Sequence, residues 1–128
     1  MSATSTDESM EKFSQPISEH LRSVALALPE TSEGTSCVNR AFKVRKKNFL
    51  FVGEKDNEVR VMLKLDASLG DVISMNDPRF DVGKTGWVTV KFAPDDVPDE
   101  SLLSAWVIES FRALGPKTLV KQLDAEAA

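Results

Sequence analysis

Residues 58–65 read Glu-Val-Arg-Val-Met-Leu-Lys-Leu, a near-strict alternation of polar and apolar side chains. Successive side chains of a β-strand point to opposite faces, so this period of two predicts a strand with one buried face. We predict that Val59, Val61, Leu63 and Leu65 point into the core. The outward side chains are then Glu58, Arg60, Met62 and Lys64.

Other segments predict further strands of the same sheet. Residues 86–92 repeat the alternation and leave Trp87 outside, either under a terminal helix or at a contact surface. Residues 47–53 are apolar on both faces, which predicts a central strand. Residues 41–45 alternate with Lys43 and Arg45 on one face, and residues 80–82 predict a brief strand. The connections are short, which favours an antiparallel meander.

Apolar residues at helical spacing, with capping and breaking residues, predict the helices. We expect four helices, over residues 16–28, 66–75, 98–114 and 117–123. Asp66 is the expected N-cap of the second helix. Residues 29–36, rich in Gly, Ser and Thr, are expected to form a polar loop.

These elements predict a single α+β domain over residues 13–128, in the order α-β-β-β-α-β-β-α-α. It contains one antiparallel sheet of about five strands with helices packed on one face. Residues 1–12 are dominated by Ser, Thr and acidic side chains, so we predict a disordered tail.

Composition limits the function classes. The 128 residues carry a net charge of −4, which argues against a protein that coats DNA through general positive charge. Cys37 is the only cysteine and cannot form an internal disulfide, which favours a cytoplasmic setting. No apolar run approaches the ~20 residues of a membrane span, and the N-terminus lacks the pattern of a secretory signal.

No pattern in the chain predicts catalysis. Gly83-Lys84-Thr85 resembles the end of a phosphate-binding loop, but that motif needs a glycine where Pro78 stands, so we predict a turn. The acidic residues between 95 and 100 are expected to form a solvated loop and helix start. His20 and Cys37 have no local features of a nucleophile–base pair, and together they are too few for a zinc site. We predict a protein that is not an enzyme and uses no metal or cofactor.

A basic cluster is the best candidate site. Five cationic side chains fall within eight residues of an otherwise acidic chain: Arg40, Lys43, Arg45, Lys46 and Lys47. Lys117 and Lys121 are further candidates for the same surface. If the strands share one sheet, Arg60 and Lys64 lie with Lys43 and Arg45 on its open face, as phosphate contacts require. The alternative is a solvated face that charge keeps soluble.

Six short segments carry a family resemblance. They are Ala25-Leu26-Ala27-Leu28-Pro29-Glu30, Glu33-Gly34-Thr35-Ser36, Ala41-Phe42-Lys43-Val44, Asp77-Pro78-Arg79-Phe80, Gly86-Trp87-Val88 and Gly115-Pro116-Lys117-Thr118-Leu119-Val120. In this order they resemble the MmcQ/YjbR family, over roughly residues 20–124. Two segments depart from the family pattern: Cys37-Val38 replaces an aromatic-Gly pair, and the loop at 81–85 is shorter.

The resemblance implies an antiparallel sheet backed by helices, similar to the architecture of secretion chaperones. It also implies DNA binding, because family members are described as DNA-binding through their likeness to a double-wing arrangement. It brings no catalytic residues. Two functions stay open: nucleic-acid binding directed mainly at the backbone, through the basic cluster, and a protein-interaction or chaperone-like module that uses the same sheet or its apolar edge.

Overall fold

The computed structural model describes residues 13, 15–36 and 39–127. The predicted disorder of residues 1–12 lies outside these residues, and so does Cys37. The elements in chain order are α2 (Pro16–Leu26), β1 (Thr31–Ser36), β2 (Asn39–Val44), β3 (Lys47–Lys55), β4 (Glu58–Lys64), α3 (Leu69–Met75), β5 (Phe80–Val82), β6 (Trp87–Phe92), α4 (Glu100–Leu114) and α5 (Lys117–Ala127).

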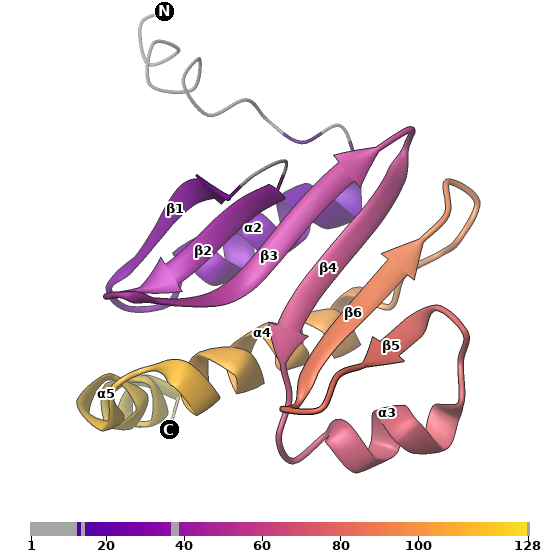
Figure 1. The fold of residues 1–128 in the computed structure, drawn as a ribbon. Coiled ribbons are helices and arrows are strands. Elements are labelled where there is room, and N and C mark those ends of the chain that lie inside the picture. The colour runs from indigo at the N-terminus through magenta and orange to yellow at the C-terminus, as the bar shows by residue number, and fades with distance from the viewer. Residues whose placement is uncertain (1–12, 14, 37–38, 128) are drawn as a thin grey trace, which may run out of the picture.

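All six strands form one antiparallel sheet in the order β1-β2-β3-β4-β6-β5 (Figure 1). The turn between β3 and β4 places Asp56 and Asn57 at φ values of 54° and 67°. Left-handed conformations at both central residues match the twist of the flanking strands in a tight hairpin, and Asp and Asn tolerate them well. The predicted α+β class with a single antiparallel sheet is confirmed.

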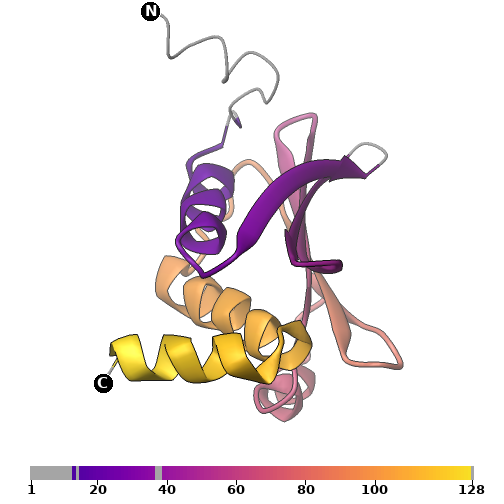
Figure 2. The same cartoon turned by 90° about the vertical axis from the view of Figure 1, so that its left-hand side faces the viewer.

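The helices α2, α4 and α5 lie on one side of the sheet, as Figure 2 shows. The helix α2 buries Ile17, Leu21 and Ala25, spaced as one helical face, and α4 buries Trp106 and Phe111. These side chains meet the inward residues of the strands, and the predicted inward positions of 58–65 are all buried. The other face of the sheet is covered by none of the described helices.

The predicted polar loop at residues 29–36 is wrong, because Thr31–Ser36 forms the edge strand β1. This strand has no apolar stripe, and polar contacts hold it instead. The Thr31 hydroxyl donates to the carbonyls of Ala25 and Leu28 at 2.8 and 2.9 Å. The carboxylate of Glu33 bonds Arg22 and Arg40, both at 2.9 Å. The sheet therefore has one strand more than the order predicted from sequence.

The helix after β4 begins at Leu69, and its N-cap is Ser68 rather than the predicted Asp66. The cap comes from a distant residue. Glu109 of α4 accepts hydrogen bonds from the backbone N–H groups of Asp66 and Ser68 and from the Ser68 hydroxyl, at 2.7–3.0 Å. This carboxylate thus holds the N-cap residue and the turn before it against α4.

Candidate functional site

The face of the sheet opposite α2 and α4 is the candidate site, and we call it the open face. The strand register and the alternation of burial place five cationic side chains on it: Lys43, Lys55, Arg60, Lys64 and Lys91. Of the anionic side chains that the structure describes, two share the open face, Glu58 and Asp81. None of the five cations forms an ion pair within the part of the chain that the structure describes. The open face is thus positive although the chain carries −4.

An apolar patch lies among these cations. Phe51 and Met62 are register partners on β3 and β4, and Trp87 of β6 lies opposite Lys64. The rings of Phe51 and Trp87 approach to 5.9 Å between centroids, with their planes at 52°. All three apolar side chains are half-buried, so part of each side chain faces solvent. Trp87 is therefore at the surface and does not pack under a helix.

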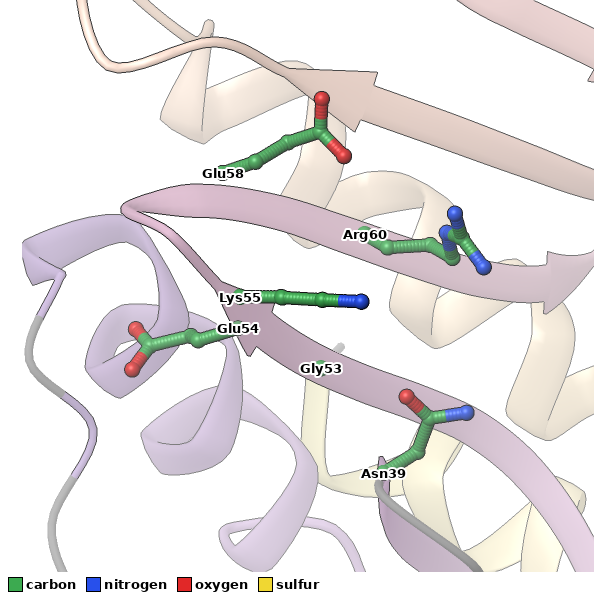
Figure 3. A pocket seen from close by; sticks show the side chains of 6 residues that line it. All are labelled: Asn39, Gly53, Glu54, Lys55, Glu58 and Arg60. Atoms are coloured by element: carbon green, nitrogen blue, oxygen red, sulfur yellow. The ribbon is translucent and has the colours of Figure 1, made fainter.

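A pocket of about 370 Å³ opens beside this patch (Figure 3). The side chains of Asn39, Lys55 and Arg60 lie around the backbone of Gly53 (Figure 3). Glu54 also lines the pocket, but its carboxylate turns toward α2 and accepts the N–H of Gln15 at 2.8 Å. The carboxylate of Glu58 also lines the pocket, which therefore offers two cationic groups, one amide and one anionic group.

Gly53 has a steric reason to lack a side chain. A Cβ built on Gly53 would lie 2.1 Å from the Oδ1 atom of Asn39. Only glycine therefore lets the Asn39 amide lie over β3 in this position. The amide and the Arg60 guanidinium consequently lie on the same face of the sheet.

A second cationic region, the hairpin end, lies where β2 turns into β3. Arg45, Lys46 and Lys47 line a hollow of about 300 Å³ together with Leu114, Gly115 and Pro116. Gly115 and Pro116 join α4 to α5, and Lys117 is the first residue of α5. The structure thus places Arg45, Lys46 and Lys47 of the predicted basic cluster near the start of α5. Lys121 lies one turn further along α5. Lys43 belongs to the open face.

Two residues of the predicted cluster are placed differently from the prediction. Arg40 lies on the helix side, where its side chain is 14% exposed, bonds Glu33 at 2.9 Å and stacks over the ring of Phe13. The predicted shared strand face of Lys43 and Arg45 is wrong, because β2 ends at Val44 and Arg45 occupies the turn at φ 57°.

Arg45 is also paired. Its guanidinium donates to both carboxylate oxygens of Glu30, at 3.0 and 3.3 Å. This hydrogen bonding lowers the pKa of Glu30 and raises the pKa of Arg45. The pair is half-exposed, so water and salt screen it, and Arg45 can exchange Glu30 for another anion at little cost.

The remaining motifs have structural roles. Gly83 turns back onto β6 through a hydrogen bond from its N–H to the Trp87 carbonyl at 2.7 Å, as expected for a turn. Asp99 caps α4 by accepting the Leu102 N–H. The Ser104 hydroxyl donates to the Glu100 carbonyl, so His20 Nε2 is the donor in its 2.7 Å hydrogen bond with that hydroxyl. Among the described residues, no three His, Cys, Asp or Glu side chains gather as metal ligands.

The sequence analysis did not assign Phe51, Lys55 or Lys91 to a site. Lys91 alternates with Val90 and Phe92, so extending the period-two pattern would have placed it outward. Phe51 carries no such signal. A bulge makes Phe49 and Leu50 both point inward, and only this irregularity directs Phe51 outward.

Comparisons with known proteins agree with this architecture. The family model YjbR matches residues 26–113, and the chain belongs to the YjbR family. It is similar to the crystal structure of a Deinococcus radiodurans protein with a DUF419 domain, at 25% identity and a TM-score of 0.61. The match covers 81% of this chain and 85% of that one. No curated protein matches the chain.

Among the described residues, no helix combines the length and the apolar content that a membrane crossing requires.

Proposed function

We propose that this YjbR-family protein binds nucleic acid weakly, mainly through the phosphate backbone, on the open face of its sheet. The observation that carries the proposal is a set of five cations on the open face of an acidic chain, none of which forms an ion pair with another described residue. Phosphate contacts need such arrays of Lys and Arg, and they supply most of the affinity in non-specific complexes. We further propose a binding role without catalysis, in the cytoplasm.

The hairpin end extends this surface. Lys46 and Lys47 are exposed and share a hollow with Pro116, and Lys117 follows Pro116 at the start of α5. A strand that crosses the open face past Lys43 would reach this region at the end of β2. Arg45 and Lys121 would contribute as secondary contacts, and Arg40 would not, because Glu33 holds it on the helix side.

The salt dependence of binding tests the proposal. Three or four phosphate contacts imply a slope of roughly −3 in a plot of log K against log salt concentration. We expect micromolar binding of mixed DNA or RNA at about 50 mM salt and a strong loss by about 200 mM. Absence of any shift at about 50 mM salt would reject the proposal.

Two matched triple variants locate the contacts. One removes Lys43, Arg60 and Lys91 from the open face, and the other removes Arg45, Lys46 and Lys117 from the hairpin end, all by substitution with Ala. Both lower the net charge by the same three units. We expect the open-face triple to reduce the slope by about 2 to 3 units and the hairpin-end triple to reduce it less.

A protein-interaction module is the second candidate function. The half-buried patch of Phe51, Met62 and Trp87 favours it, because exposed apolar patches rimmed by polar groups also mark protein contacts. Binding dominated by apolar burial depends little on salt. A partner protein whose affinity stays constant between about 50 and 200 mM salt would support this alternative over nucleic acid.

A further inference from the structure

We propose that the open face is a stacking platform for single-stranded nucleic acid, with Phe51 and Trp87 as the base-binding side chains. This inference rests on the proposed function and narrows it to one class of ligand. It also gives the apolar patch a role that phosphate binding alone leaves unexplained.

The platform has the composition that unpaired bases need. Two aromatic rings, 5.9 Å apart and tilted by 52°, are partly exposed on the same face, and the Met62 side chain lies between their strands. Every base has a π-face, so aromatic side chains bind unpaired bases with little sequence preference. Partial exposure leaves ring surface for a base to cover.

Cations flank the platform on both sides along the strands. On β4, Arg60 precedes Met62 by two residues and Lys64 follows it by two. At a rise of about 3.3 Å per residue, each cation lies about 7 Å from the row of Phe51 and Met62. Arg60 of β4 and Lys91 of β6 are register partners, so the row of cations extends from β4 toward β5. A strand whose bases cover the rings therefore finds cations for its phosphates on either side.

The pocket over Gly53 adds a recess to the platform. The volume of the pocket is about 370 Å³, and Asn39, Lys55 and Arg60 on its rim suit one phosphate or one splayed nucleotide. Glu58 lines the same pocket and is the single anionic side chain, among the described residues, that such a ligand would meet there besides Glu54, whose carboxylate turns toward α2. The Asn39 amide and the Arg60 guanidinium supply directional hydrogen-bond donors there. The recess is open because Gly53 has no side chain.

The same geometry disfavours a duplex as the best ligand. Bases inside a duplex are stacked and paired, so their faces are closed to Phe51 and Trp87. Duplex DNA could use only the cations, and the apolar patch would then lose water contact without a partner. Unpaired bases can use the cations and the rings together, so we expect single strands to bind more tightly.

Binding of three probes to the full chain tests the inference. The probes are a labelled single-stranded oligonucleotide of about 16 thymidines, a mixed-sequence duplex of equal length and inorganic polyphosphate, at about 50 mM salt. Trp106 is 2% exposed in the core, so quenching of tryptophan fluorescence reports mainly on Trp87. We expect the single strand to bind best and to quench, and the duplex and polyphosphate to bind without quenching.

Two substitutions at Trp87 separate stacking from apolar burial. Trp87→Leu keeps an apolar side chain but removes the ring, and we expect it to weaken single-strand binding roughly ten-fold while duplex binding stays the same. Trp87→Phe retains a ring and should keep most of the affinity while abolishing the quench. Circular dichroism and thermal unfolding verify that both variants fold.

The outcomes distinguish the two proposals. If all three probes bind equally and Trp87→Leu changes nothing, phosphate binding stands and the platform is rejected. If none of the probes binds at about 50 mM salt, the proposed function itself is rejected along with the platform. If an acidic peptide competes with the single strand and shows the same loss in Trp87→Leu, the platform serves a protein ligand and the inference is overturned.

Discussion

The hydroxyl of Ser110 joins α4 to the sheet at the point where β3 and β4 diverge. It donates to the Phe49 carbonyl at 2.6 Å and accepts the Lys64 N–H at 2.9 Å. Neither backbone group has a partner in the β3–β4 register, which begins at Leu50 and Leu63. One fully buried side chain thus replaces a missing rung of the sheet.

We expect Ser110→Ala to lower the free energy of unfolding by about 2–4 kcal/mol, because it leaves the buried Phe49 carbonyl and the partly buried Lys64 N–H without this partner. Ser18→Ala is the matched control. The Ser18 hydroxyl is equally buried, but it has no hydrogen-bond partner among the described residues. Its removal should be neutral or stabilising. Urea denaturation gives the free energy of unfolding of both variants. Equal losses of stability in Ser110→Ala and Ser18→Ala would contradict the role of Ser110.

Glu109 makes the start of α3 sensitive to acid. Burial raises the pKa of its carboxyl, but the hydrogen bonds from Ser68 and Asp66 outweigh this effect, and the pKa falls below its ordinary value of 4.5. A carboxyl whose pKa is lower in the folded protein than in the unfolded chain stabilises the fold at pH values above its unfolded pKa. This stabilisation is lost as the pH falls through the folded pKa. Glu109→Gln should therefore be less stable than the parent at pH 7, with a difference that shrinks below about pH 4. A constant difference across that range would contradict this assignment.

Strand β1 shows how an element can form without a hydrophobic pattern. Glu33 lies on the helix side with its side chain only 7% exposed, and Arg22 and Arg40 neutralise it from α2 and β2. We expect Glu33→Gln to cost about 1–2 kcal/mol and to speed hydrogen exchange in β1 while β4 and β6 keep their rates. Glu30→Gln, which removes the half-exposed partner of Arg45, should change stability by less than about 0.5 kcal/mol. Equal losses of stability in Glu33→Gln and Glu30→Gln would contradict the larger role that we assign to the buried carboxylate of Glu33.

The elements that the sequence predicted well are those with a hydrophobic period. The alternation at 58–65 and 86–92 marked β4 and β6, and helical spacing marked α2 and α4. Strand β1 was missed because its inward positions are the polar residues Thr31, Glu33 and Thr35. The charge of Glu33 is balanced there by Arg22 of another element. Pairing across the fold decided that strand, and no local pattern carries such information.

The candidate site could be predicted only in part, for a related reason. Alternation correctly placed Arg60 and Lys64 on the outward face of β4. The contact of Phe51 with Trp87 requires the order β3-β4-β6, in which β6 joins the sheet from a distant part of the chain. It also requires the bulge at Phe49, which no residue in the sequence marks. The basic run at 40–47 was visible, yet the fold divides it among three surfaces.

Across the molecule, charge is separated rather than uniform. Among the described residues the open face holds five cations and two anions, a net charge of +3, while the whole chain carries −4, so the residues outside the open face together carry −7. This separation should orient a polyanion toward the open face, because exposed charges act over roughly one Debye length, about 10 Å at 0.1 M salt. If net charge governs binding, removing an anion should have the same effect anywhere on the surface, whereas local charge predicts an effect only on the open face.

Two double variants test which charge governs binding. Glu58→Gln with Asp81→Asn removes both anions of the open face, and Glu100→Gln with Asp95→Asn removes two exposed carboxylates around the start of α4. Both doubles change the net charge from −4 by two units. If the open face binds phosphates, the first double should tighten single-strand binding several-fold at about 50 mM salt, and the second should leave it nearly unchanged. Equal gains from both would show that net charge alone governs association and that the open face is not the contact surface.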